Sequence, residues 1–282
     1  MKPVRRDFLA ELPKPELHCH LDGSLRIETM LDLAQKDKVE LPSKTSDGLR
    51  KAVVVSGRVK NLEEYIEKFR ITLAVLQTPE ALERAAYELA QDAAAENVRH
   101  LEVRYSPILH KEHGMTPMES LDAVITGLRQ AKHDFNISTG VIICGIRNFS
   151  IESSIELAEL AIAYKYRGVI GYDLAGAEEN FPAKDHLAAF YLIRNNNINV
   201  TLHAGEAFGP RSIHQAIHYC GANRIGHGTR LREDGDLMNY INDHRICLEI
   251  CLTSNMQTGS INKIENHPLK FYHDYGLRVT LN

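Results

Sequence analysis

The stretch His18-Cys19-His20-Leu21-Asp22-Gly23-Ser24 places two imidazoles and a carboxylate at the end of a predicted β-strand. Successive side chains of a strand point to opposite faces, so His18 and His20 project the same way while Cys19 points away. Two imidazoles side by side at a strand end can hold one metal ion. This stretch therefore predicts a strand whose carboxyl end carries a metal site.

Seven further β-rich runs follow, and helical patterns such as 153–165 and 212–219 lie between most of them. This alternation is typical of a parallel α/β sheet. Eight strands with polar or ionisable residues at their carboxyl ends favour a (β/α)8 barrel of the TIM type over a doubly wound sheet. No G-x-G-x-x-G opens a helix after a strand, so a dinucleotide site has no support. The predicted strands are 16–22, 99–105, 139–146, 168–174, 199–203, 224–227, 246–251 and 277–281.

The connection after the first strand is unusually long, and we interpret residues 24–98 as a helical cap inserted into one barrel domain spanning 1–282. Ordinary core packing would explain an apolar stripe in this cap. Its position on the mouth side of the first strand raises the alternative that the stripe covers a pocket. Five apolar side chains have the i, i+3, i+4, i+7 and i+11 spacing of one helix face: Leu62, Tyr65, Ile66, Phe69 and Leu73.

Composition narrows the class of protein. With 282 residues, 44% of them hydrophobic, the chain can bury a substantial core, and its formal charge of -4 gives no electrostatic reason to expect nucleic acid or an anionic membrane as a partner. No protein partner is evident from the sequence. A small, neutral or mildly polar substrate fits better. Five cysteines without a C-x-x-C pair, and no apolar signal core after Met1, predict a reducing, cytoplasmic setting.

Three predicted strand ends carry the chemistry: His18 and His20, then His203 to Glu206, then His227. In a barrel these ends face one cavity. Neutral imidazole suits zinc, and catalytic zinc sites have about three protein ligands plus a water. His227 alone would be explained as a buried, satisfied histidine, but the whole set predicts a metal site.

Glu206 stands three residues after His203, on a Gly205 turn. It can therefore reach a substrate beside the metal rather than ligate the metal. A carboxyl group in a dry pocket has a raised pKa, so it can hold a proton and donate it. An isolated glutamate would be explained as a solvated loop carboxylate.

Taken together, these residues resemble the adenosine deaminase family of zinc aminohydrolases. H-x-H alone is shared by many amidohydrolases and by unrelated metallophosphatases, but the combination is specific and spans nearly the whole chain. The matching segments, in the family's order, are residues 16–24, 101–107, 172–176, 203–206, 224–228, 253–258 and 279–282.

The resemblance implies zinc-dependent hydrolytic deamination of adenosine and 2'-deoxyadenosine to inosine and 2'-deoxyinosine plus ammonia, in purine salvage, with one Zn²⁺ per chain. It implies that Glu206 protonates or hydrogen-bonds the purine N1, and that His227 orients or deprotonates the attacking water. The implied zinc ligands are His18, His20 and His203, with His20 also lying against the substrate.

For the nucleoside itself, the resemblance implies that the Gly176 backbone N–H approaches the purine N3. It implies that Asp22 accepts a hydrogen bond from the ribose 5'-hydroxyl. A hydrophobic lid over the nucleoside is implied for Leu62, Tyr65, Ile66 and Phe69.

In the family, a threonine and two aspartates follow Leu281-Asn282, and the first aspartate ligates zinc. The sequence stops at Asn282. We therefore expect a fragment that lacks the closing loop and helices after strand eight and binds metal weakly, or else a chain that has lost catalysis. Ala177, where the family often has an acidic residue, is a smaller departure.

Two other functions remain as alternatives: an adenine deaminase of the same superfamily and a non-catalytic nucleoside-binding protein. The segment 173–176, and Gly226 before His227, look more like the nucleoside enzyme than adenine deaminase. A nucleotide deaminase is disfavoured because Asp22 would face a 5'-phosphate, and like charges repel.

Overall fold

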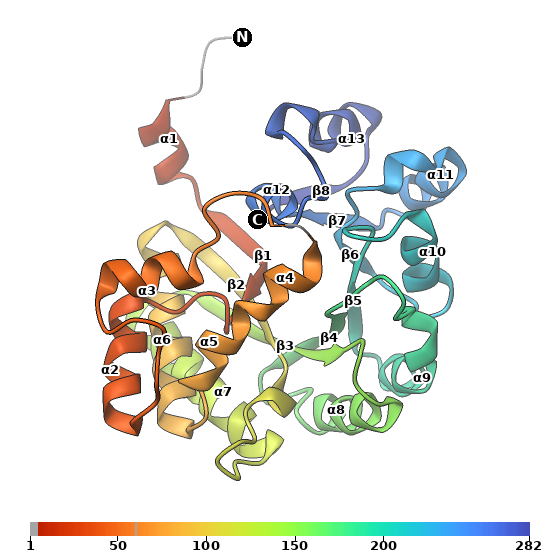
Figure 1. Cartoon of the computed structure of the whole chain (residues 1–282). Helices are drawn as coiled ribbons and strands as arrows, with labels where there is room; N and C mark the ends of the chain where they lie inside the picture. The colour runs from red at the N-terminus through yellow and green to blue at the C-terminus, as the bar shows by residue number, and fades with distance from the viewer. Residues whose placement is uncertain (1–4, 60) are drawn as a thin grey trace.

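The computed structural model describes residues 5–59 and 61–282, and its central feature is a sheet of eight strands in the order β1 to β8 (Figure 1). Each strand pairs in parallel with the next one along the chain. The predicted barrel is confirmed, and the predicted strand limits lie within two residues of the observed ones. The strands are β1 Lys14–His20, β2 Val98–Tyr105, β3 Ser138–Ile146, β4 Val169–Ala175, β5 Asn199–Ala204, β6 Arg224–His227, β7 Cys247–Ile250 and β8 Val279–Leu281.

The barrel is nearly closed between β8 and β1. Asn282 follows β8, and its backbone N–H donates to the carbonyl of Ile250 at 2.9 Å. Its side-chain Oδ1 accepts a hydrogen bond from the Leu17 N–H of β1 at 3.2 Å. One side chain therefore connects the first and last strands.

Helices cover the outside of the sheet, and local signals set where they begin. Thr116 and Glu119 form a reciprocal capping box before Pro117, and the side chain of Thr78 accepts the Ala81 N–H at 3.3 Å. The α-helices are α1 Arg6–Glu11, α2 Ile27–Asp37, α3 Ser46–Val53, α4 Leu62–Glu67, α5 Phe69–Ala74, α6 Pro79–Ala95, α7 Pro117–Phe135, α8 Ile151–Ala163, α9 Leu187–Asn195, α10 Pro210–His218, α11 Gly235–Asp243, α12 Leu252–Gln257 and α13 Leu269–Tyr275. Short 3-10 helices are η1 Pro107–Leu109, η2 Ala183–His186, η3 Leu231–Glu233 and η4 Ile264–Asn266.

The long connection between β1 and β2 contains α2 to α6, and its apolar stripe is not one continuous helix as predicted. The stripe divides into α4 and α5 at Lys68, whose N–H bonds the carbonyl of Tyr65 at 3.1 Å in a tighter turn. Lys68 keeps helical dihedral angles, with φ -63° and ψ -30°, so the apolar face passes through the break. The periodicity located the face but could not locate the break.

The barrel interior is polar, and β2 shows how this arises. Leu101, Val103 and Tyr105 are buried among the apolar side chains of the core. The alternate residues, Glu102 and Arg104, are buried in ion pairs with strands across the barrel. The alternation typical of strands therefore directs charge toward the barrel axis.

No helix within the described residues is both long and apolar enough to cross a bilayer.

Candidate active site

Three imidazoles predicted to be metal ligands meet at the carboxyl end of the barrel. His203 Nε2, at the end of β5, lies 3.1 Å from His18 Nε2 and 3.1 Å from His20 Nε2 on β1. Gly226 on β6 makes room for this cluster, because a Cβ there would lie 2.9 Å from His18 Cε1. The structure thus brings together residues that lie 183 and 185 positions apart in the sequence.

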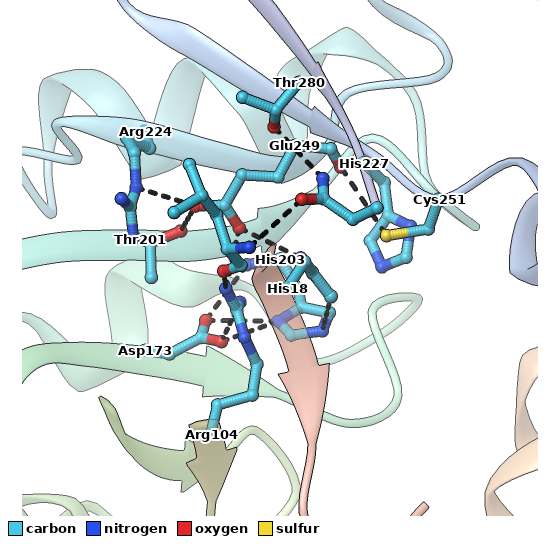
Figure 2. A network of polar contacts seen from close by, with 12 residues as sticks. His18, Arg104, Asp173, Thr201, His203, Arg224, His227, Glu249, Cys251 and Thr280 are labelled. Atoms are coloured by element: carbon cyan, nitrogen blue, oxygen red, sulfur yellow. Dashed lines mark hydrogen bonds and ion pairs between the residues drawn. The ribbon is translucent and has the colours of Figure 1, made fainter. Parts of the chain in front are cut away.

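Carboxylates behind two of these rings fix which nitrogen is free (Figure 2). His18 Nδ1 donates to Glu249 Oε2 at 2.9 Å, and His203 Nδ1 donates to Asp173 Oδ2 at 2.9 Å. Both rings therefore carry their proton on Nδ1 and turn an Nε2 lone pair toward the cluster. Burial, reinforced by the charge of Arg104, holds the pKa of His18 well below its ordinary value.

This donor set fits a zinc ion. Two nitrogens bound tetrahedrally at about 2.0–2.1 Å from zinc lie roughly 3.4 Å apart, close to the observed separations. Burial also holds the pKa of His20 well below its ordinary value, as neutral ligands require. A second set of candidate ligand atoms, on His18, His227 and Cys251, overlaps the first through His18.

The loop after β5 is fixed by one buried carboxylate. Glu178 accepts four consecutive backbone N–H groups, from residues 205–208, at 2.5, 3.0, 2.6 and 2.9 Å. Gly205 takes a φ of +71° at the turn, where a side chain would also collide with Ile213. Glu178 therefore determines where Glu206 points.

The Glu206 side chain is buried beside the imidazoles. Its Oε1 accepts from Thr258 Oγ1 at 3.1 Å, and its Oε2 lies 3.4 Å from His227 Nε2. Burial, opposed by His203 and reinforced by the negative charge of Glu178, raises the pKa of Glu206 to about 7. A carboxyl group with this pKa can hold a proton near neutral pH and release it.

His227 ends β6 with a φ of +67°, a conformation uncommon for residues other than glycine. Its ring centroid lies 4.8 Å from that of His18 and 5.1 Å from that of His203. The His227 ring is thus held against the imidazole cluster by a strained backbone conformation, and such conformations are common at functional sites.

Asp22 follows β1 and borders a cavity of about 400 Å³, which Tyr65, Lys68 and Phe69 also line. Its Oδ1 is buried without a hydrogen-bond partner among the described residues. Burial raises the pKa of Asp22 to about 7. An unpartnered buried carboxyl oxygen at a cavity wall suits a ligand that donates a hydrogen bond.

The other predicted substrate contacts lie after β4 and on α4 and α5. Gly176 directly follows β4 with a φ of +99°, and the Phe69 ring centroid lies 6.2 Å from that of His20. Tyr65 lies close enough to Glu206 for that charge, after burial, to raise the pKa of its hydroxyl. Leu62 is buried and Ile66 half-buried in the short helix α4.

Three supporting residues escaped the sequence reasoning: Glu178, Asp173 and Glu249. Each is an acidic residue at or just after a strand end, and that position was the available signal. Their partners lie 27 to 231 residues away, so only the fold identifies them.

Comparison with known families gives one model that covers almost the whole chain. The adenosine deaminase family model matches residues 13–282. The adenosine deaminase of Clostridium perfringens (strain SM101 / Type A) is 40% identical over 274 residues, which are 97% of this chain and 82% of that protein. A probable adenosine deaminase of Dictyostelium discoideum is 40% identical over 280 residues, and the match spans 99% of this chain but 36% of that protein.

Solved structures repeat the fold. The adenine deaminase of Arthrobacter aurescens has a TM-score of 0.89 at 27% identity, covering 96% of this chain and 81% of that one. The N6-mAMP deaminase of Arabidopsis has a TM-score of 0.84 at 30% identity, covering 98% of this chain and 82% of that one.

Proposed function

The chain belongs to the adenosine deaminase family of hydrolytic deaminases, and from that premise we propose that it converts adenosine and 2'-deoxyadenosine to inosine and 2'-deoxyinosine in purine salvage. The observation that carries the proposal is a cluster of three converging imidazoles beside the buried Glu206 carboxyl group, whose pKa is raised to about 7 by burial. The cytoplasmic setting and the lack of macromolecular partners stay predictions.

We propose that His18, His20 and His203 hold one Zn²⁺. The chemistry that the bound ion supplies is activation of water, whose pKa falls from 15.7 to about 7 on coordination. By accepting the Nδ1 protons of His203 and His18, Asp173 and Glu249 leave the Nε2 lone pairs of both rings free for the ion that would bind there.

In the proposed reaction, Glu206 transfers its proton to the purine N1, which withdraws electrons from C6. The water oxygen bonds to C6, the C6–N6 bond breaks, and ammonia leaves. Overall, one water is consumed: its oxygen enters the product, one of its protons goes to the departing amine to give ammonia, and the other restores the proton that Glu206 gave to N1. Glu178 holds the loop 205–208 through its backbone N–H groups, and this supports the Glu206 carboxyl group in a fixed position for the transfer.

We assign the rest of the nucleoside to Asp22, at the ribose 5'-hydroxyl, and to the Gly176 N–H, at N3. His20 and the side chains of α4 and α5 would cover the purine. On this view the segment 24–98 acts as a cap. The set of cap residues is Leu62, Tyr65, Ile66 and Phe69.

The decisive experiment compares kcat/KM for adenosine, adenine and adenosine 5'-phosphate, with zinc supplied and metal content measured. Adenosine should be preferred, because Asp22 accepts a hydrogen bond from a hydroxyl and, when ionised, repels a phosphate. Asp22→Ala should reduce kcat/KM for adenosine by about 1–3 kcal/mol in transition-state stabilisation, while the exposed control Asp236→Ala should have no effect. A higher value for adenine would assign an adenine deaminase. A higher value for the nucleotide would show that Asp22 does not face the 5' position, and zinc binding without ammonia release would indicate a nucleoside-binding protein.

A further inference from the structure

Three consecutive hydrogen bonds lead to the Nδ1 atom of His227, and in each of them the group farther from His227 is the donor. The first bond starts at the backbone N–H of Leu269, which can only donate and lies 3.0 Å from His267 Nδ1. A ring nitrogen that accepts carries no proton, so neutral His267 has its proton on Nε2. Burial, with the nearby charge of Arg232, lowers the pKa of His267 to about 4 and keeps the ring neutral near pH 7.

The next two bonds transmit this polarity. His267 Nε2 lies 3.1 Å from Asn255 Oδ1 and donates to it, which fixes the orientation of the amide. The amide Nδ2 then lies 3.0 Å from His227 Nδ1 and donates to that nitrogen. Because His227 Nδ1 accepts, the neutral His227 ring must carry its proton on Nε2.

The protonated nitrogen faces the reaction site. His227 Nε2 lies 3.4 Å from Glu206 Oε2, at the edge of the imidazole cluster. His18 and His203 have the opposite arrangement, since carboxylates accept their Nδ1 protons and leave Nε2 lone pairs. A carboxylate that accepts the Nδ1 proton therefore leaves His18 and His203 with Nε2 lone pairs for a metal. An amide that donates to Nδ1 instead leaves His227 with an Nε2 proton.

We infer that Asn255 and His267 are positioning residues that hold His227 in its Nε2–H tautomer, so that His227 orients the attacking water by donating a hydrogen bond and does not deprotonate it. The catalytic part of this inference rests on the proposed deamination. The tautomer itself does not. The same reasoning excludes His227 Nε2 as a metal ligand, which leaves His18, His20 and His203 as the ligand set.

The tautomer can be measured directly on the whole chain labelled with ¹⁵N-histidine, using long-range ¹H–¹⁵N correlation spectra with and without added zinc. His227, assigned by the loss of its signals in His227→Gln, should show the Nε2–H pattern in both samples. Buried His110 is an internal control, because its Nδ1 donates to the Leu76 carbonyl at 2.8 Å and must give the opposite pattern. An Nδ1–H pattern for His227 in the wild-type chain would overturn the inference whether or not the chain deaminates adenosine.

Asn255→Asp provides the sharper variant. A carboxylate has nearly the same shape and still accepts from His267, but it would accept rather than donate at His227 Nδ1. The His227 spectrum should change to the Nδ1–H pattern while that of His110 stays the same. With zinc and adenosine, kcat should fall about 10²-fold with KM within about twofold, as for loss of one donor to the transition state. An unchanged His227 tautomer in a folded variant would contradict the positioning role, and the wild-type spectrum decides the question if the variant does not fold.

Discussion

The loop 205–208 after β5 carries Glu206, whereas α4 and α5, the proposed lid, line the cavity beside Asp22, and different forces hold the two regions. A single buried carboxylate accepts four backbone N–H groups of the loop, and Ser260 Oγ donates to the Glu206 carbonyl at 2.8 Å. These are short, directional, charge-assisted bonds. The loop therefore fixes the backbone of Glu206, the residue proposed to transfer a proton.

The proposed lid instead consists of two helices of six residues each, held at separate points by individual hydrogen bonds. Asn61 caps α4 by accepting the Glu64 N–H, and Lys68 Nζ donates to the Ala52 carbonyl at 2.9 Å. Its cavity face presents rings, with Tyr65 and Phe69 centroids 6.1 Å apart. Apolar contact is not directional, so the lid can contribute binding energy without fixing the geometry of the reaction.

The largest expected effect is on kcat, and it follows from changing the carboxyl group that the loop 205–208 carries. In Glu206→Gln the amide cannot supply the N1 proton, so kcat for adenosine should fall by about 10²–10⁴-fold with unchanged zinc content. Steady-state kinetics and metal analysis measure both quantities, and the exposed control Glu265→Gln should match wild type. Retention of more than roughly a tenth of wild-type kcat would remove Glu206 from the proton-donor role.

The next effect tests how the loop is held. Glu178→Gln leaves at least one buried N–H of residues 205–208 facing an amide NH₂, and the free energy of unfolding in urea should fall by about 1–3 kcal/mol. The adjacent Glu179 is exposed, so Glu179→Gln is the matched control and should change stability little. Equal stability of the two variants would mean that the four bonds do not hold the loop.

The same variant should shift the pH profile. In the proposed reaction Glu206 acts in its protonated form, so wild-type kcat should decline as pH rises through about 7, the pKa to which burial and the Glu178 charge raise this group. Removing that negative charge removes one cause of the raised pKa. The alkaline limb of Glu178→Gln should therefore lie at lower pH, whereas Glu179→Gln should leave it in place. A limb that moved to higher pH would contradict the assignment of this ionisation to Glu206.

The smallest effect concerns the lid. Phe69→Ala removes apolar contact with the ligand and should raise KM for adenosine about 5–10-fold, with kcat within about twofold. Phe271→Ala is a suitable control, because Phe271 is an exposed aromatic on α13. A fall in kcat as large as the fall in kcat/KM would show that the lid also sets reaction geometry and would break the contrast with the loop.

The sequence predicted the barrel and the meeting of His18, His20 and His203, because parallel strand ends must share one rim and alternation decides which side chains face it. It could not predict Glu178. The resemblance directed attention to position 177, whereas the acidic group sits one residue later and bonds a loop 27 to 30 residues away. The break at Lys68 was missed because hydrophobic periodicity reports which face is apolar and says nothing of hydrogen-bond continuity. The Asn255–His267 polarity depends on atom-level orientation, which residue identities alone do not specify.

The contacts of Arg104 should affect how the barrel strands open locally in solution. From β2, this fully buried guanidinium donates to Asp173 on β4 at 2.8 Å, to Glu249 on β7 at 2.7 Å and to the Leu17 carbonyl on β1 at 2.6 Å. One side chain thus links four strands, β1, β2, β4 and β7, inside the barrel. Opening any one of them locally would remove at least one hydrogen bond from a buried charge, so their central amides should exchange with deuterium as one cooperative unit, more slowly than those of the capping helices.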